Sequence, residues 1–150
     1  MKKSLQIASK RQRLISSTHQ FPKKQKTGSK QLNLAKITAY QRQFIAAREW
    51  DKYHTPKNLT IGLSVEVSEL LELMIWMTDK QVRSLLSSAS GRGRIEEEIA
   101  DIFYYLVRLT DVLDINLESA FWRKTRLNEK KYPVNLSRGN AKKWSELAKK

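Results

Sequence analysis

The sequence contains no cysteine and only two histidines, His19 and His54. The lack of cysteine excludes disulfides, thiolate zinc sites and cysteine nucleophiles. No run of eighteen or more apolar residues is free of charge, and the N-terminus lacks the apolar segment of a signal peptide. We therefore expect a soluble, cytoplasmic protein that makes no membrane contact. The chain of 150 residues is long enough for one domain with a substantial core.

Acidic residues are absent from the first 36 positions, which carry eight Lys and two Arg and so hold most of the formal charge of +14. Few large apolar residues occur there, so burial cannot offset the entropy of ordering the segment. We predict a flexible basic extension over residues 1–33, a helical domain over 34–133 and a basic tail over 134–150. The extension is either a solubilising segment or a contact arm for nucleic acid, with an organellar transit peptide as a further alternative.

Sustained strand alternation is also absent, and apolar residues recur at helical spacing. We predict an all-α four-helix bundle, because the pattern indicates helices over residues 34–50, 56–78, 94–113 and 117–130. Residues 79–94 are predicted as a connection that contains a short helix at 80–87. Thr55 before Pro56 is typical of a helix start. The second helix is apolar on nearly every side, so we expect it to lie centrally or in the interface of a dimer or tetramer.

Two pairs of acidic residues stand inside these apolar helices, Glu66 with Glu69 and Glu98 with Asp101. A spacing of three places both carboxylates of a pair on one helix face, and charge among apolar residues is costly unless it is paired. On two packed helices, the four carboxylates could converge on one or two cations, and all-oxygen ligation favours Mg²⁺. The alternative is two solvated helix faces. A di-iron oxidase site is disfavoured, because its Glu-x-x-His motif is missing.

The acidic pairs resemble the signature of the MazG-like superfamily of all-α nucleotide pyrophosphohydrolases, which is Glu-x-x-Glu, a spacer and then Glu-x-x-Asp. Upstream, the segment from Arg48 to Leu59, Arg-Glu-Trp-Asp-Lys-Tyr-His-Thr-Pro-Lys-Asn-Leu, is similar to the dCTP pyrophosphatase branch of that superfamily. Downstream, Lys124, Asn128 and the Lys-Tyr-Pro segment that ends at Pro133 are similar to the same branch. The three blocks occur in the order that the branch shows.

The resemblance implies hydrolysis of a nucleoside triphosphate between its α and β phosphates, which gives a monophosphate and pyrophosphate. It implies that Mg²⁺, or Mn²⁺ in its place, is held by four catalytic ligands: Glu66, Glu69, Glu98 and Asp101. The implied substrate is dCTP or a related non-canonical nucleotide, which the enzyme would remove from the pool as house-cleaning. The resemblance further implies a set of substrate contacts: Trp50, Asp51, His54, Trp76, Tyr105, Lys124 and Asn128.

Other readings of these residues stay open. On composition alone, core packing is the alternative for the tryptophans and the tyrosine, and a solvated helix face is the alternative for Lys124. A different class of function is a nucleic-acid-binding or interaction module that uses the basic extension on a helical scaffold. Nucleic acid is then expected to bind only through that extension. A signalling or toxin-associated hydrolase is a third hypothesis.

Overall fold

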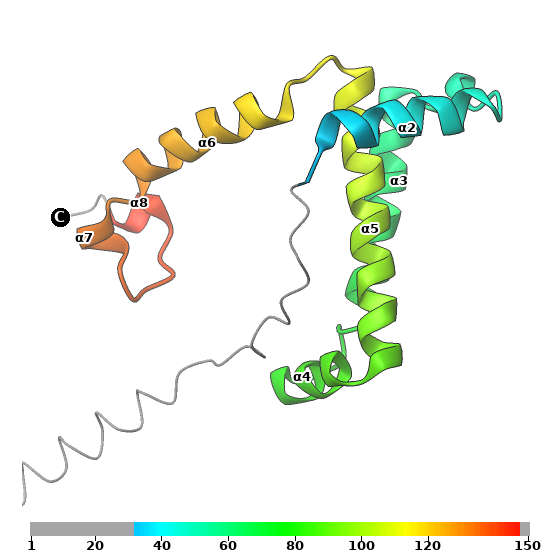
Figure 1. Ribbon diagram of the computed structural model, residues 1–150. Helices are drawn as coiled ribbons and strands as arrows, with labels where there is room; N and C mark the ends of the chain where they lie inside the picture. Colours follow the sequence, from blue (N-terminus) through cyan, green and yellow to red (C-terminus); the bar gives the residue numbers. More distant parts are fainter. Residues whose placement is uncertain (1–31, 148–150) are drawn as a thin grey trace, which may run out of the picture. The chain divides into compact units, whose positions relative to one another are not determined.

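The computed structural model describes residues 32–147. The predicted flexible extension, apart from its last two residues, lies outside the described residues, and so do the last three residues of the predicted tail. The described part is all-α and contains no strand, which confirms the all-α class that the sequence predicts (Figure 1). The packing of four helices into one bundle stays a prediction. Its elements are α2 (Leu34–Ala46), the 3-10 helix η1 (Asp51–Tyr53), α3 (Pro56–Glu72), α4 (Asp79–Ser87), α5 (Ala89–Val112), α6 (Leu117–Lys131), α7 (Val134–Ser137) and α8 (Trp144–Leu147). No helix in this part is both long and apolar enough to span a lipid bilayer.

Side-chain caps begin the principal helices. The Oδ1 atom of Asn33 accepts a hydrogen bond from the backbone N–H of Lys36 at the start of α2. Thr55 Oγ1 accepts from Asn58 N–H at 3.2 Å, and Pro56 occupies the first position of α3, as the sequence predicts. Each cap satisfies a backbone N–H group that has no partner inside the helix.

Two predicted helices end earlier than expected. The first ends at Ala46 instead of residue 50, because Glu49 takes a left-handed conformation with φ of 54° that stops the helix. The second ends at Glu72 instead of residue 78. Thr78 is extended there and its N–H donates to the side chain of Gln81, which starts α4 with a capping box.

The predicted connection over residues 79–94 is wrong beyond its short helix. That short helix is present as α4, but α5 begins at Ala89 instead of residue 94. Ser88 Oγ accepts from the N–H of Gly91 at 3.1 Å and so caps α5. Gly91 is buried, and a Cβ atom there would lie 2.5 Å from the backbone oxygen of Leu85. The glycine therefore allows α4 and α5 to approach closely and does not break the helix.

The helix α5 contacts each of the α-helices that the structure describes before it in the chain. It packs along α3 and also contacts α2 and α4 (Figure 1). Four apolar side chains from α2, α3 and α5 are buried and form the core: Ile45, Leu59, Ile95 and Val107. The buried side chain of Gln41 joins α2 to α5, because its Nε2 donates to the backbone oxygen of Tyr104 at 2.9 Å. Both helices of the predicted metal site thus belong to one packed unit.

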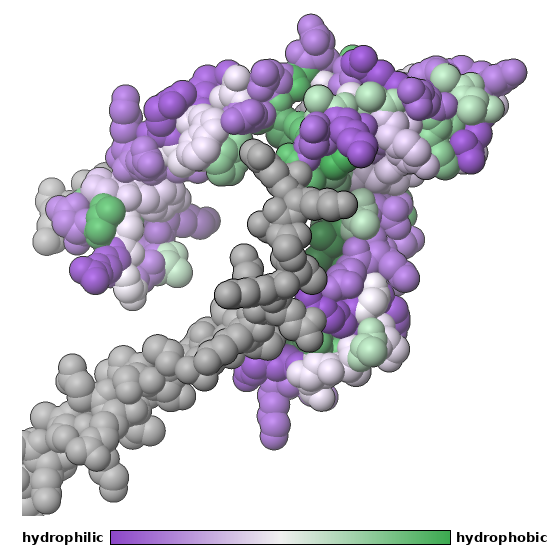
Figure 2. Space-filling view, viewed as in Figure 1, coloured by the Kyte–Doolittle hydropathy of each residue, from purple (hydrophilic) through white to green (hydrophobic). Residues whose placement is uncertain are grey.

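Much of the apolar surface of α3 is not covered by the described residues. Leu59 is its one buried residue, whereas Ile61, Val65, Val67 and Leu71 are each about half exposed. Hydrophobic residues also reach the surface of this unit (Figure 2). On α5, Ile99 is 52% exposed. The described residues therefore do not surround α3 as a central helix, and its place in a subunit interface stays a prediction.

Candidate metal centre

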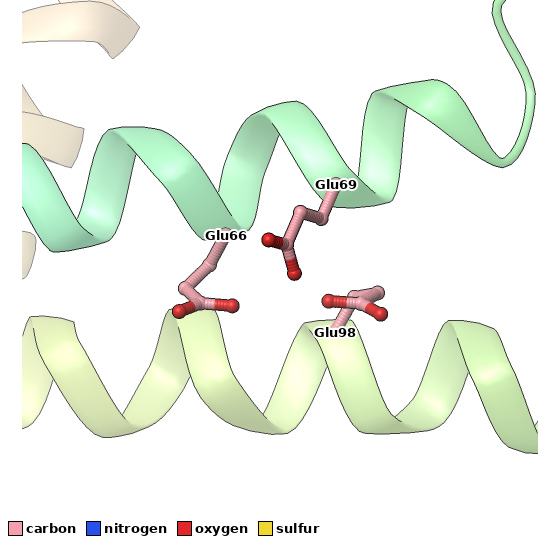
Figure 3. A group of neighbouring side chains, drawn as sticks. All are labelled: Glu66, Glu69 and Glu98. Atoms are coloured by element: carbon pink, nitrogen blue, oxygen red, sulfur yellow. The ribbon is translucent and has the colours of Figure 1, made fainter.

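Glu66 and Glu69 lie on the side of α3 that faces α5, and Glu98 lies on the side of α5 that faces α3 (Figure 3). Both glutamates of α3 face the same neighbour because they are one turn apart. The two helices run antiparallel. Tyr105 of α5 lies against Gly62 of α3. Glu98 is about two turns earlier in α5 than Tyr105, and it lies beside Glu69, which is later in α3 than Gly62. This arrangement brings acidic residues from distant parts of the sequence to the same height.

One oxygen atom from each of Glu66, Glu69 and Glu98 lies within 4.8 Å of the other two. Glu66 and Glu98 are partly buried and Glu69 is exposed. Three carboxylates at this separation repel one another unless protons or a cation compensate them. The arrangement offers hard oxygen ligands to a divalent cation, and the exposed Glu69 leaves one side of it open to solvent.

Two of these carboxylates, Glu66 and Glu98, have raised pKa values. Burial raises the pKa of Glu66, and the charges of Glu69, Asp101 and Glu98 raise it further. Burial also raises the pKa of Glu98, followed by the charges of Glu69 and Asp101. Among the described residues, none of the four carboxylates forms an ion pair with a basic side chain. The donor set therefore fits a divalent cation, whose charge would reverse these shifts.

Asp101 stands apart from the other three acids. It follows Glu98 by one turn on α5 and is exposed, and its carboxylate is not within the 4.8 Å group. Its charge nevertheless raises the pKa of both Glu66 and Glu98, so it belongs to the same electrostatic cluster. Its role as a metal ligand stays a prediction.

Tyr105 lies one turn beyond Asp101 on α5 and is partly buried against α3. A Cβ atom at Gly62 would lie 2.7 Å from Cζ of the tyrosine ring. The absence of a side chain at Gly62 therefore makes room for the phenol ring across α3. The glycine was not singled out in the sequence, where it stands unremarkably within a helical stretch.

The segment that carries Trp50, Asp51 and His54 forms an aromatic group beside α2. The ring of Trp50 meets that of Phe44 edge to face, with centroids 6.1 Å apart, and the ring of His54 lies 6.5 Å from that of Trp50. The guanidinium of Arg48 covers Phe44 at 3.5 Å. Trp50 stays 43% exposed, so it is not simply a core residue and offers indole surface to a ligand.

Burial lowers the pKa of His54, and the positive charge of Arg108 lowers it further, whereas Asp51 acts in the opposite direction. The imidazole is therefore neutral at pH 7. Its Nδ1 atom is buried and has no hydrogen-bond partner among the described residues. A neutral ring can offer either a donor or an acceptor at its remaining nitrogen.

The structure also identifies a buried arginine that the sequence analysis missed. Arg108 is 7% exposed and donates to two carboxylates, Asp51 Oδ1 at 2.7 Å and Asp111 Oδ2 at 2.8 Å. Arg42 donates to both oxygens of Asp111. The one available signal was a basic residue among the apolar residues of the third predicted helix, since a buried charge requires a partner.

Among the described residues, no hydrogen bond or ion pair joins three of the predicted substrate contacts to the acidic cluster. Trp76 lies in the turn after α3 and is 90% exposed. Lys124 and Asn128 lie one turn apart on α6 with exposed side chains, which form no hydrogen bond or ion pair with other described residues. Their roles in substrate binding stay predictions.

Comparisons with known proteins agree with these observations. The sequence profile of the MazG-like family matches residues 61–147. The chain is 37% identical over 119 residues to dCTP pyrophosphatase 1 of Bos taurus, which covers 79% of this chain and 70% of that protein. It is 35% identical over 114 residues to dCTP pyrophosphatase 1 of Homo sapiens, covering 76% and 67%.

Among solved structures, the fold matches the crystal structure of a pyrophosphatase from Archaeoglobus fulgidus with a TM-score of 0.64 and 40% sequence identity. The match covers 70% of this chain and 96% of that one. The resemblance seen in the sequence is therefore confirmed by a family profile, by curated relatives and by a solved fold.

Proposed function

This chain belongs to the MazG-like family, and on that premise we propose that it hydrolyses nucleoside triphosphates to the monophosphate and pyrophosphate in a Mg²⁺-dependent reaction. The observation that carries the proposal is the convergence of Glu66, Glu69 and Glu98 from two helices, with no basic side chain of residues 32–147 paired with them. The relatives named dCTP pyrophosphatase 1 support a phosphoanhydride substrate and favour dCTP or a related non-canonical nucleotide. Removal of such nucleotides from the pool is the proposed purpose.

Glu66, Glu69 and Glu98 would hold the metal, with Asp101 completing the set of ligands. When bound, Mg²⁺ or Mn²⁺ supplies charge neutralisation at the phosphate oxygens and lowers the pKa of a bound water. Glu69, the exposed one of the three clustered glutamates, would orient the attacking water and accept its proton. The water oxygen bonds to the α-phosphorus, the bond from that phosphorus to the bridging oxygen breaks, and pyrophosphate leaves.

The base is proposed to bind at the exposed indole of Trp50, because stacking on an aromatic face is worth about 1–3 kcal/mol per base. Asp51, His54 and Tyr105 would line the same side, with Trp76 as a second stacking surface. Lys124 and Asn128 would contact phosphate or sugar oxygens. A dimer or tetramer is proposed because the half-exposed apolar side chains of α3 need a cover.

The test is a panel of canonical and modified nucleoside triphosphates, assayed for pyrophosphate release with Mg²⁺ and with EDTA. We expect release only with the metal, a monophosphate as the second product, and the highest kcat/KM for dCTP or a modified cytosine nucleotide. Release of single inorganic phosphates would contradict the assigned bond. Deletion of residues 1–33 separates the alternative function: nucleic-acid binding should be lost with the basic extension while hydrolysis stays unchanged.

A further inference from the structure

We propose that Arg108 is a positioning residue that fixes the base-binding segment, residues 50–54, to α5 at a set distance from the acidic cluster. This inference rests on the proposed function, because it assigns a role in substrate binding. Arg108 itself is buried and does not need to touch the nucleotide. Through Asp51, its side chain connects α5, which carries part of the acidic cluster, to the base-binding segment.

Each arm of the guanidinium of Arg108 contacts a different part of the chain. Nη2 donates to Asp51 Oδ1 in η1 at 2.7 Å, and Nη1 donates to Asp111 Oδ2 on α5 at 2.8 Å. The side chains of Arg108 and Asp111 are 8% and 7% exposed, whereas that of Asp51 is 63% exposed. The buried contact with Asp111 therefore orients the guanidinium of Arg108, and the guanidinium holds the exposed carboxylate of Asp51.

Arg42 keeps Asp111 compensated independently of Arg108. It donates to both carboxylate oxygens of Asp111, and this hydrogen bond is the first cause of the lowered pKa of Asp111. Removal of the Arg108 charge therefore does not leave Asp111 buried without a partner, which is the usual reason that breaking a buried ion pair unfolds a protein. The role of Arg108 can accordingly be tested by substitution.

The base-binding segment has little else to hold it against α5. Its other hydrogen bonds do not reach α5: Trp50 N–H donates to Ile45 O, Tyr53 N–H to Trp50 O and His54 N–H to Asp51 O. Asn58 Nδ2, in the first turn of α3, also donates to Tyr53 O at 3.0 Å. Among the described residues, the bond from Arg108 to Asp51 is the single hydrogen bond between residues 50–54 and α5. A three-residue 3-10 helix is not rigid by itself. The ion pair is thus the main polar constraint on where the segment lies.

The position of Arg108 along α5 gives this constraint its function. Arg108 follows Asp101 by seven residues, which corresponds to about 10 Å along the helix and to nearly the same face. Glu98, Asp101, Tyr105 and Arg108 are spaced three, four and three residues apart and so share one stripe of α5. The helix therefore sets about 10 Å between the proposed metal-binding carboxylates and the residue that holds the base-binding segment, and Arg108 fixes that separation.

The experiment compares the full-length protein with Arg108→Gln, Arg108→Lys and Asp51→Asn, and with Arg92→Gln as the matched control. Arg92 also lies on α5 and pairs with a glutamate, but both side chains are exposed and neither contacts residues 50–54. Steady-state kinetics with dCTP and Mg²⁺ give KM and kcat for each variant. Amide hydrogen exchange at Tyr53 and His54 reports the order of the segment without any turnover.

We expect Arg108→Gln to raise KM about tenfold, the loss expected of one charge-assisted hydrogen bond at a partly solvated site, with kcat within about twofold. Exchange at the amides of Tyr53 and His54 should accelerate, and Arg108→Lys should lie between wild type and Arg108→Gln. The double variant with Asp51→Asn should be no worse than the more impaired single variant, because both changes break the same contact. Arg92→Gln should behave as wild type in both measurements.

Unchanged KM and unchanged amide exchange in Arg108→Gln would overturn the inference, and so would additive losses in the double variant, which would indicate that Asp51 acts separately. If Arg108→Gln fails to fold, Asp51→Asn, at an exposed position, decides through the same exchange measurement. An inactive wild-type enzyme would contradict the proposed function, whereas an active wild type with insensitive Arg108 variants would contradict only the positioning role.

Discussion

Replacement of Glu66 by glutamine should stabilise the protein without metal and remove its stabilisation by Mg²⁺. Glu66 has two carboxylate neighbours whose nearest ligand oxygens lie within 4.8 Å. Two unit charges at that distance repel by about 1 kcal/mol at the dielectric constant of water, and more in a less polar medium. Glutamine has nearly the same shape and keeps one oxygen acceptor, so it removes the charge without leaving a cavity.

Glu66 is partly buried, but its neighbour Glu69 is exposed to solvent, so we apply the water-like value to the repulsion and expect salt to reduce it. We therefore expect Glu66→Gln to gain about 1 kcal/mol at low ionic strength in EDTA, which corresponds to about 2–4 °C in Tm. With saturating Mg²⁺, the wild type should instead be more stable than Glu66→Gln. A ligand at 100 times its Kd stabilises the wild type by about 2.7 kcal/mol, and the variant should lose most of this gain.

The assay is thermal unfolding followed by circular dichroism, in EDTA and across a Mg²⁺ titration, for wild type, Glu66→Gln and the control Glu72→Gln. Glu72 is exposed on the same helix and is not among the causes of the Glu66 and Glu98 pKa shifts. The order of Tm for wild type and Glu66→Gln should reverse as Mg²⁺ is added. A variant that is less stable than wild type in EDTA, or equally stabilised by Mg²⁺, would refute the reasoning.

Two further predictions concern packing and pH. Gly62→Ala should destabilise the protein by about 1–3 kcal/mol, since the added methyl group would overlap the ring of Tyr105, and urea unfolding measures the loss. Without metal, the raised pKa of Glu66 contributes stability below the ordinary glutamate pKa that is lost as the pH rises through the raised value. The lowered pKa of Asp111 has the opposite sign, so its contribution is present above the ordinary aspartate pKa and lost on acidification through the lowered value. Urea unfolding against pH should therefore show a smaller decline toward neutral pH in Glu66→Gln and a smaller acid loss in Asp111→Asn, and parallel curves for all three proteins would contradict both assignments.

The acidic cluster could be predicted because its information is local. A three-residue spacing fixes the face that Glu66 and Glu69 share, whatever packs against it, and apolar neighbours indicate that this face is inside the protein. The start of α3 could be predicted for the same reason, since Thr55 and Pro56 act within one turn. The identity of the family came from three such local blocks taken together.

The contact between Arg108 and Asp51 could not be predicted, because 57 residues separate the two along the chain. Helix spacing indicates which residues share a face, but it does not say which distant loop returns to that face. The early start of α5 was missed for a related reason. Gly91 is unfavourable in an isolated helix, and only its close contact with Leu85 explains why it is there.

The apolar residues of α3 show a different limit of sequence reasoning. Their pattern correctly indicates a helix with almost no polar face, but it does not say whether the same chain or another one covers it. The structure leaves Ile61, Val65 and Leu71 about half exposed. Trp76 is a similar case. Its large apolar side chain suggested either core packing or a place in a binding pocket, but it is 90% exposed among the described residues.

The most direct test of the account is the hydrolysis of dCTP by wild type, Glu66→Gln and Glu72→Gln in the presence of Mg²⁺, with pyrophosphate and monophosphate quantified together. We predict that wild type and Glu72→Gln release the two products in equal amounts. Glu66→Gln should be slower by about 100-fold or more, because the loss of a metal-binding carboxylate removes several kcal/mol of transition-state stabilisation. Full activity of Glu66→Gln, in a protein that unfolds cooperatively like the wild type, would contradict the assignment of the acidic cluster as the metal centre.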